Sequence, residues 1–222
     1  MKPIVSNGVF EREGHDTVSP SFFYFILMLS VIWGLGATGY AAQYANEIEY
    51  MPKTIWELLS IGLLIPILGI VIALKSDEAI VSFIGYNLVV FPFGFLLGPV
   101  LQEYNADVVR NACYLTGTIT IVMGFTGVLF PRVYENMGGG LFIALTGLVI
   151  VRILQIFIPA MQSWGWIEYL SAGIFSLYIG YDMYRASVIG KTIDNAIDVS
   201  VSLYLDIINL FLNILRILGS KK

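Results

Sequence analysis

Cysteine and histidine are the scarcest reactive residues in this sequence. Its 222 residues include one cysteine, Cys113, and one histidine, His15, which precedes the first apolar stretch. A single cysteine excludes an internal disulfide and a cysteine-based metal cluster. A single histidine outside the apolar stretches excludes a Ser-His or Cys-His catalytic pair within them, and it excludes a multi-histidine metal site.

Charge is also sparse, and the basic residues are not concentrated in one place. Asp, Glu, Lys and Arg make up 13% of the chain, and the formal net charge is −4. The basic residues are scattered near the ends of apolar stretches, so they form no patch that would attract nucleic acid. We therefore expect no nucleic-acid partner.

Apolar residues, in contrast, dominate the composition. They make up 57% of the chain, and the mean hydropathy is +0.80. A water-soluble domain of this size could not cover so much apolar surface with polar side chains. Because about 20 apolar residues cross a bilayer, the length holds roughly six to eight membrane-spanning helices. The composition predicts an all-α integral membrane protein embedded in the lipid bilayer.

Seven apolar segments follow one another along the chain. They are residues 22–43, 55–74, 79–102, 108–130, 141–158, 167–184 and 196–218. We predict a seven-helix transmembrane domain over residues 22–218, after a cytoplasmic N-terminal segment of residues 1–21 and before a short tail of residues 219–222.

Glycines and prolines predict local features of these helices. In the first segment, Gly34, Gly36 and Gly39 predict the close approach of a neighbouring helix. Pro92 and Pro99 predict a kinked or partly unwound third helix.

The connection between the fourth and fifth segments is rich in the same residues. It contains Pro131 and the run Gly138-Gly139-Gly140, which predict a flexible linker.

The distribution of Lys and Arg predicts the orientation of the chain. With seven spans, one side holds six of these residues and the other holds four. The positive-inside rule then predicts a cytoplasmic N-terminus in a prokaryotic inner membrane, with the C-terminus outside. A half-inserted last helix would instead return the tail to the cytoplasm.

A polar stripe runs along the last segment. At 100° per residue, six of its polar side chains fall within an arc of about 80°. They are Asp198, Ser202, Asp206, Asn209, Asn213 and Arg216. The sixth segment carries a similar face, within about 100° on the same construction. Its members are Glu168, Ser171, Tyr178 and Asp182.

Two acids, Asp182 and Asp206, would lie within the membrane on these faces. An ionised Asp there costs about 2.5–3.5 kcal/mol, so neither is expected to face lipid. If the carboxyls approach to about 4 Å, their repulsion at an effective dielectric of about 20 is about 4 kcal/mol. Such a pair would share one proton near neutral pH and titrate as a unit. A purely structural role, with hydrogen bonds to neighbouring polar groups or to Arg216, is the alternative.

The remaining charged residues each have two interpretations. Asp198 lies either on the ion path or in a solvated structural position near the helix end. Arg152 is expected either to pair with one of these acids, as a possible cationic partner of Asp182 and Asp206, or to extend its charge to the interface. Lys75 is either an interfacial anchor or a cationic partner of the acid pair. Glu57, at the start of the second helix, is expected to interact with the helix dipole.

Several strings of residues resemble the Bax inhibitor-1 family, also called the transmembrane Bax-inhibitor-motif family. They are Gly180–Asp182, Val201–Phe211, Leu215–Gly219 and the small-residue and proline pattern Gly94–Leu101. The likeness is to bacterial members of the YetJ and YccA type. It implies a seven-helix bundle with the last helix at its centre, surrounded by the other six.

The resemblance also implies a function and roles for residues. It implies a pH-sensitive calcium leak gated by a proton-sharing pair, Asp182 and Asp206, with Arg216 as an ion-pair latch. Other polar residues of the two helices are expected to line or support the ion path: Tyr178, Asp198, Ser202, Asn209 and Asn213. Calcium would be the permeant ion, with no cofactor, and two carboxylates with Asn209, serines and water would form only a weak transit site. The bacterial leak protein carries an arginine-rich end to its second helix, whereas this chain has Lys75 there.

Two other functions remain open at this point. Family members that lack the last-helix acid are associated with restraining a membrane protease, so a regulator of another membrane protein is the first alternative. Tyr181-Asp182 is also similar to a motif of intramembrane aspartyl proteases. Asp206 follows Leu203-Tyr204-Leu205, however, and lacks the Gly-x-Gly-Asp pattern of those enzymes. We therefore expect that the chain is not an enzyme.

Overall fold

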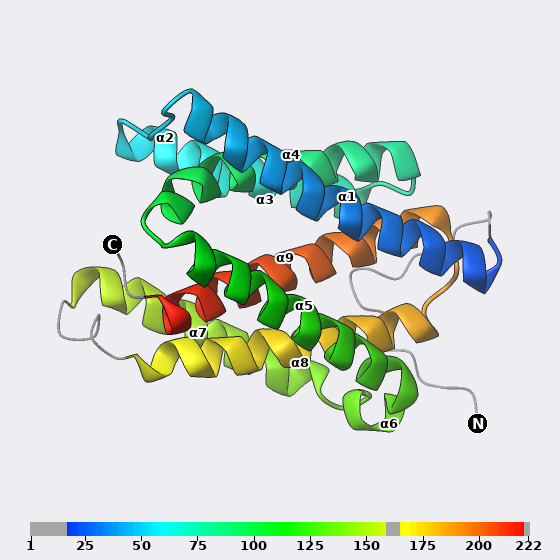
Figure 1. Cartoon of the computed structure of the whole chain (residues 1–222). Coiled ribbons are helices and arrows are strands. Elements are labelled where there is room, and N and C mark those ends of the chain that lie inside the picture. The colour runs from blue at the N-terminus through cyan, green and yellow to red at the C-terminus, as the bar shows by residue number, and fades with distance from the viewer. Residues whose placement is uncertain (1–16, 159–164, 220–222) are drawn as a thin grey trace. The chain divides into compact units, whose positions relative to one another are not determined.

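A computed structural model describes residues 17–158 and 165–219 of the chain. His15, most of the N-terminal segment and the last three residues of the tail therefore lie outside the described residues. Within them all regular structure is helical (Figure 1). The internal contacts divide the chain into two units. Unit 1 comprises residues 1–103 and 189–204, and unit 2 comprises residues 104–188 and 205–222.

Unit 1 contains the first three apolar segments and the start of the last helix. Its elements are α1 (Pro20–Glu47), α2 (Ile55–Leu59), the π-helical turn η1 (Ser60–Leu64), α3 (Ile65–Lys75), α4 (Ala79–Gln102) and residues 193–204 of α9. Helix α4 packs against both α1 and α3.

Unit 2 contains the next three segments and the remainder of the last helix. Its elements are α5 (Ala106–Leu129), α6 (Pro131–Tyr134), α7 (Gly138–Phe157), α8 (Trp166–Val188) and residues 205–218 of α9 (Ile193–Leu218). Helix α8 packs against α5, α6 and α7.

Local sequence explains where the first helix begins. Ser19 is in an extended conformation, and its hydroxyl accepts a hydrogen bond from the amide of Phe22 at 3.3 Å. Pro20 follows at the first helical position, where a missing N–H costs nothing and a fixed φ suits the helix.

The second apolar segment is one continuous helix with a π turn inside it. The amide of Ile65 donates to the carbonyl of Ser60, five residues earlier, instead of the usual four. Pro66 follows directly and has no N–H to donate. A π turn widens the helix at the place where the proline ring would otherwise crowd the preceding turn.

The third segment differs in part from its prediction of a kinked or partly unwound helix. Helix α4 is continuous from Ala79 to Gln102 although it contains Pro92 and Pro99, so it is not unwound there, and a kink at these prolines stays a prediction. Packing supplies the physical reason, because α1 covers this region closely. The Thr38 hydroxyl donates to the Val90 carbonyl at 3.4 Å, and a Cβ added at Gly94 would meet Ala41 Cβ at 2.5 Å.

Two further predictions about glycines are corrected. Of the three glycines in α1, Gly34 lies against the Tyr86 ring, whereas Gly36 and Gly39 have no described neighbour within 4 Å of an added Cβ. Gly138, Gly139 and Gly140 form the first turn of α7 rather than a flexible linker. Gly138 packs against the Tyr181 side chain, and this tertiary contact outweighs the weak helix propensity of glycine.

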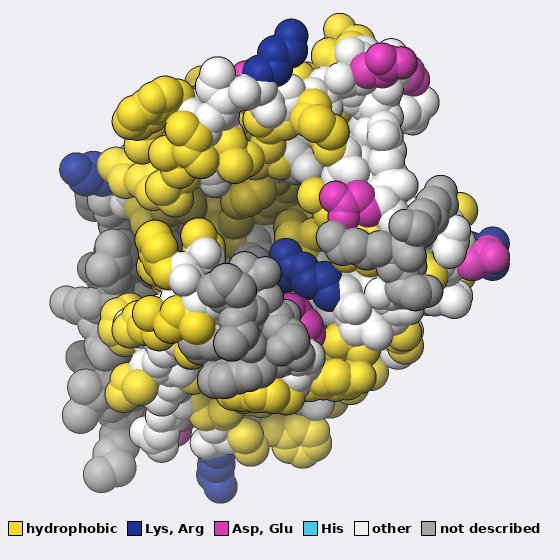
Figure 2. Space-filling view, turned by 90° about the vertical axis from the view of Figure 1, so that its left-hand side faces the viewer, with side chains coloured by type: hydrophobic (Ala, Val, Ile, Leu, Met, Phe, Trp, Pro, Cys, Tyr) yellow, Lys and Arg dark blue, Asp and Glu magenta, His cyan; other side chains and the backbone are white. Residues whose placement is uncertain are grey.

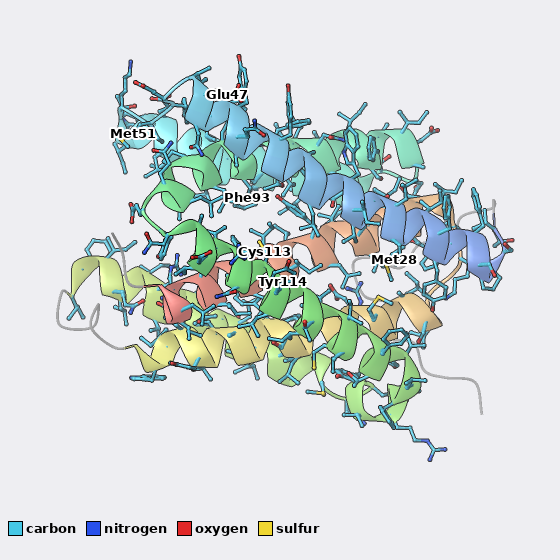
Figure 3. The ribbon with its side chains drawn as sticks, in the orientation of Figure 1. Met28, Glu47, Met51, Phe93, Cys113 and Tyr114 are labelled. Carbon is cyan, nitrogen blue, oxygen red and sulfur yellow. The ribbon has the colours of Figure 1, made fainter. Side chains whose placement is uncertain are left out.

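The described outer surface is largely apolar. Figure 2 shows hydrophobic side chains over much of one face, with charged side chains in small groups. Figure 3 labels Met28 on α1 and Tyr114 on α5, both exposed. Water-soluble monomers rarely expose continuous apolar surface of this extent, so these helices are suited to contact with lipid.

Among the described residues, six helical segments are long and apolar enough to cross a membrane. They are Pro20–Glu47, Ile55–Lys75, Ala79–Gln102, Ala106–Leu129, Gly138–Phe157 and Ile193–Leu218. Helix α8, which carries Glu168, Asp182 and Arg185, is not among them.

A cluster of hydroxyl groups holds α1, α4 and the start of α9 together within unit 1. The Thr38 and Tyr204 hydroxyls lie 2.6 Å apart, and the Tyr86 hydroxyl donates to the Ser30 carbonyl at 3.2 Å. The rings of Tyr86 and Tyr204 meet edge to face, with centroids 5.6 Å apart. We call Thr38, Tyr86 and Tyr204 the hydroxyl cluster.

Candidate functional site

Asp182 on α8 and Asp206 on α9 face each other in unit 2. Both residues are buried, with 3% and 9% of their surface exposed, and their carboxyl groups form a hydrogen bond with each other. A hydrogen bond between two carboxyl groups requires a proton on one of them. The second oxygen of Asp206, Oδ2, is buried and has no hydrogen-bond partner among the described groups. We call Asp182 and Asp206 the acid pair.

The helical periodicity of the two segments explains this arrangement. Each acid lies on the polar face of its own helix, so packing of the two faces brings the carboxyls together. Both acids lie well inside their helices, where the backbone N–H groups already donate within the helix and cannot donate to the carboxyl groups.

Arg185 is the cation next to the acid pair. Its Nη1 donates to Asp182 Oδ1 at 3.2 Å, and the side chains of Arg185 and Asp182 are 14% and 4% exposed. Arg185 was not among the site residues predicted from the sequence. The available signal was the three-residue spacing from Asp182, which places two side chains on the same face of a helix.

Tyr178 also faces the acid pair, one turn before Asp182 on α8. Its phenol lies within electrostatic range of both carboxyls. Tyr178 thus lies where it was predicted, beside the acids, and its supporting role remains a prediction.

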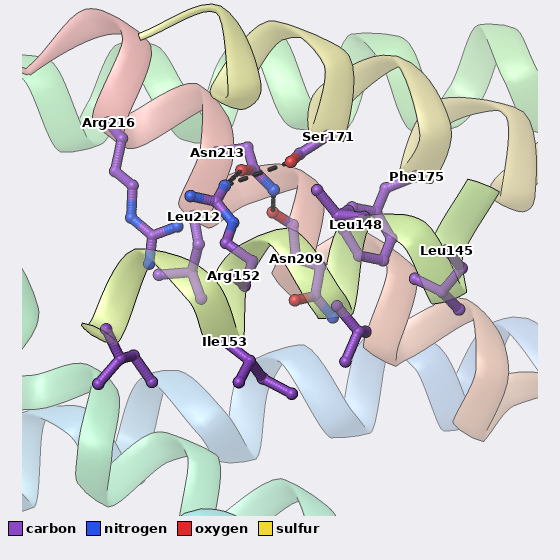
Figure 4. A pocket seen from close by; sticks show the side chains of 12 residues that line it. Leu145, Leu148, Arg152, Ile153, Ser171, Phe175, Asn209, Leu212, Asn213 and Arg216 are labelled. Carbon is purple, nitrogen blue, oxygen red and sulfur yellow. Dashed lines mark hydrogen bonds between the residues drawn. The ribbon is translucent and has the colours of Figure 1, made fainter. Parts of the chain in front are cut away.

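A second polar cluster joins α7, α8 and α9 in unit 2. Arg152 donates two hydrogen bonds to the carboxylate of Glu168. Nη1 lies 2.8 Å from Oε1, and Nη2 lies 2.6 Å from Oε2. Nη2 also donates to Ser171 Oγ at 3.2 Å and to Asn213 Oδ1 at 2.9 Å (Figure 4). Nη1 donates in addition to Gln155 at 3.2 Å. Arg152 therefore pairs with Glu168 rather than with Asp182 or Asp206, for which it was considered a possible cationic partner.

Arg216 completes this cluster from the last turn of α9. Its Nη1 lies 3.6 Å from Glu168 Oε2, beyond hydrogen-bonding distance, and its side chain is 46% exposed. We call Arg152, Glu168 and Arg216 the arginine cluster. The latch role implied for Arg216 remains a prediction, since the acid that it approaches is Glu168.

The predicted stripe on α9 is divided between the two units. Asp206, Asn209, Asn213 and Arg216 belong to unit 2, and Asp198 and Ser202 belong to unit 1. Asp198 is buried, so the prediction of a solvated structural position for it is wrong. Lys75 ends α3 in unit 1, and Glu57 lies in the first turn of α2, as predicted. The ion-path roles of Asp198 and Ser202, and the pairing of Lys75, remain predictions.

The acid pair offers few ligands to a metal ion. Across the ranges 17–158 and 165–219, no three His, Cys, Asp or Glu side chains come together in a metal-binding group. Calcium binds six to eight oxygens in a tight site. Two carboxylates, one of them paired with Arg185, would contribute to a weak site only.

Comparison with known proteins identifies the family of the chain. The family described as "Inhibitor of apoptosis-promoting Bax1" matches residues 19–222. The chain belongs to this family. The Bax inhibitor-1 resemblance inferred from the last two helices is thereby confirmed.

Bacterial proteins are among the relatives of this Bax inhibitor-1 family member. The inner membrane protein YbhL of Escherichia coli is 26% identical over 205 residues, which cover 85% of this chain and 87% of YbhL. An uncharacterized protein of Helicobacter pylori is 29% identical over 204 residues, covering 78% of this chain and 88% of the relative. An uncharacterized membrane protein of Vibrio cholerae is 27% identical over 202 residues, covering 88% and 86%. With its apolar helices, this chain is a multi-pass integral membrane protein of the Bax inhibitor-1 family.

Proposed function

We propose that this protein is a pH-sensitive calcium leak channel whose gate is the acid pair. The observation that carries the proposal is the hydrogen bond between the buried carboxyls of Asp182 and Asp206. Intramembrane acids that face a helix bundle and meet each other are typical of proton and ion pathways.

Electrostatics supplies a mechanism for the gate. With one shared proton, the two carboxyls attract each other through their hydrogen bond and link α8 to α9. When this proton leaves, two negative charges at about 4 Å repel by about 4 kcal/mol at an effective dielectric of about 20. Loss of the proton therefore favours separation of the two groups, or entry of a cation between them. Arg185 offsets part of this repulsion through its contact with Asp182.

A passing calcium ion would find weak binding at this gate. The two carboxylates, the Asn209 amide oxygen one turn further along α9, and water molecules are the candidate ligands. Conduction requires that an ion can leave as readily as it enters, so weak binding suits a leak.

The proposed topology has seven spans, with α8 as the sixth. Helix α8 has 23 residues, long enough to cross the hydrocarbon core, and its charged side chains are paired: Glu168 with Arg152 of α7, and Arg185 with Asp182 of α8 itself. In the most apolar window of α9, 61% of the residues are buried, compared with 39% or less in the other candidate spans. This burial supports a central position for the last helix. The distribution of Lys and Arg supports a cytoplasmic N-terminus in a prokaryotic inner membrane.

Calcium flux into vesicles tests the proposal directly. The purified full-length protein is reconstituted around a calcium-sensitive dye, and uptake is measured between pH 5 and 8. We expect flux that changes with pH in the wild type and pH-independent flux in the Asp182→Asn, Asp206→Asn double variant.

Asp107→Asn is the matched control, because Asp107 is an exposed acid on α5. It should keep the wild-type profile. Equal flux from the wild type and the double variant at every pH would overturn the proposal.

A further inference from the structure

A cavity of about 260 Å³ lies among α7, α8 and α9 of unit 2, next to the arginine cluster. Its apolar walls include Leu145 and Leu148 of α7, Phe175 of α8 and Leu212 of α9 (Figure 4). Arg152, Asn209 and Arg216 line it as well, so the cavity is apolar along its walls and cationic at one edge. The acid pair does not line it.

The two arginines differ in how fully they are engaged. Arg152 donates five hydrogen bonds, to Glu168, Gln155, Ser171 and Asn213, and the carboxylate of Glu168 neutralises it. Arg216 has one longer contact, 3.6 Å from Glu168, and it is about half exposed. The cluster therefore carries one net positive charge, and Arg216 has N–H groups available for a ligand.

Asn209 adds a second polar group to the cavity. Its Nδ2 donates to the Leu205 carbonyl at 2.8 Å, and its side-chain oxygen accepts no hydrogen bond from a described group. The amide is half-buried on the cavity wall between the apolar side chains and the arginines.

We propose that this cavity holds part of one acyl chain of an anionic phospholipid, with the lipid phosphate bound by Arg216. Arginine binds phosphate through two parallel N–H donors, and this interaction strengthens away from water. A volume of about 260 Å³ is slightly below the range of small-molecule pockets, roughly 300–1,000 Å³, and it suits a segment of one chain.

Charge and location select the bilayer phospholipid as the occupant. The arginine cluster has a net positive charge, so an anionic headgroup complements it and a zwitterionic headgroup does so less well. Two of the three surrounding helices, α7 and α9, are long and apolar enough to cross a membrane, which makes bilayer lipid the most abundant amphiphile at this edge.

Direct binding measurements test the proposal without any ion flux, so its outcome is independent of the calcium leak. The full-length protein in detergent is titrated with phosphatidylglycerol or with phosphatidylcholine of identical chains, and retained lipid is counted by native mass spectrometry. We expect phosphatidylglycerol to bind at least about ten-fold more tightly, as for a charged hydrogen bond of 1.5–3 kcal/mol.

Two variants separate the headgroup from the acyl chain. Arg216→Gln removes the exposed cation and should weaken phosphatidylglycerol binding about ten-fold, and the binding of phosphatidylcholine by a smaller factor. Leu212→Trp fills the cavity and should weaken binding of phosphatidylglycerol although Arg216 is intact. Arg132→Gln is the matched control, because Arg132 is exposed on α6 and does not line the cavity.

Three results would overturn the proposal. The first is equal binding of the two lipids by the wild type. The second is phosphatidylglycerol binding by Arg216→Gln or Leu212→Trp as tight as in the Arg132→Gln control. The third is displacement of phosphatidylglycerol by equimolar oleate, because the site would then recognise a free fatty acid rather than a phospholipid.

Discussion

The hydroxyl cluster of unit 1 and the acid pair of unit 2 both join α9 to a neighbouring helix through buried polar groups. The groups are neutral hydroxyls in the first and carboxyls in the second. Tyr204 and Asp206 lie two residues apart on α9, and each joins this helix to a neighbour through a buried polar contact. Hydroxyl groups stay neutral across physiological pH, so their hydrogen bonds do not respond to it. The acid pair depends on one proton. One helix thus contains a pH-independent contact and a pH-dependent contact side by side.

The arginine cluster extends this comparison, because it links helices through ions that remain paired. Arg152 and Glu168 are 29% and 19% exposed at the side chain and form a bidentate contact. Removal of one partner leaves a partly buried charge, whereas removal of a hydroxyl leaves only a neutral group. Substitutions in the ion pair should therefore reduce stability more than substitutions in the hydroxyl cluster.

Arg152→Met should have the largest effect on stability. It leaves the Glu168 carboxylate without its principal partner, at a cost of about 3 kcal/mol in the free energy of unfolding. Chemical unfolding in detergent micelles measures this cost. The double variant Arg152→Met, Glu168→Met should recover most of the loss, because the charge that then lacks its partner, Arg216, is about half exposed to solvent. A double variant less stable than the single variant would contradict this account.

Arg185→Gln should change the pH response of calcium flux more than it changes stability. A cation beside a carboxyl favours its ionised form by about one pH unit or more. Without Arg185, the midpoint of the flux profile should therefore move to higher pH by about one unit. Arg110→Gln serves as the control, since Arg110 pairs with Asp107 on the surface of α5. An unchanged midpoint would show that Arg185 does not influence the titration of the acid pair.

Tyr204→Phe should have the smallest effect, and it should be independent of pH. It removes the 2.6 Å contact with Thr38, and one buried hydrogen bond is worth about 1 kcal/mol. The loss in thermal stability should be the same at pH 5 and pH 8. Tyr40→Phe is the control, because Tyr40 on α1 is exposed and should tolerate the change. A loss of thermal stability in Tyr204→Phe that differs between pH 5 and pH 8 would contradict the distinction between the hydroxyl cluster and the acid pair.

The lengths of the apolar segments allowed much of the fold to be predicted. The third helix begins and ends at the predicted residues, Ala79 and Gln102, and the last helix extends its prediction by three residues at its start. The angular positions of Asp182 and Asp206, with the cost of exposing a charge to lipid, predicted that both face away from lipid. That the two acids form a pair was implied by the family resemblance.

Contacts between distant residues could not be predicted in the same way. The helical start of α7 depends on Tyr181 packing against Gly138, and the pairing of Arg152 depends on Glu168 lying opposite to it. Arg185 was overlooked because a cation near the end of a span is usually an interfacial anchor. Each of these contacts depends on the tertiary packing of the helices, which the sequence around either residue does not specify.

The π turn at Ser60–Leu64 has a consequence for comparing relatives. A π turn accommodates one residue more than an α turn, so the side chains on either side of it are offset by about 100° from a regular helix. A relative with one residue fewer at this point would keep both helix ends and all of the contacts that α3 makes with α4. Alignments of this family should therefore tolerate a single-residue gap within Ser60–Leu64, inside a membrane span where gaps are otherwise unexpected.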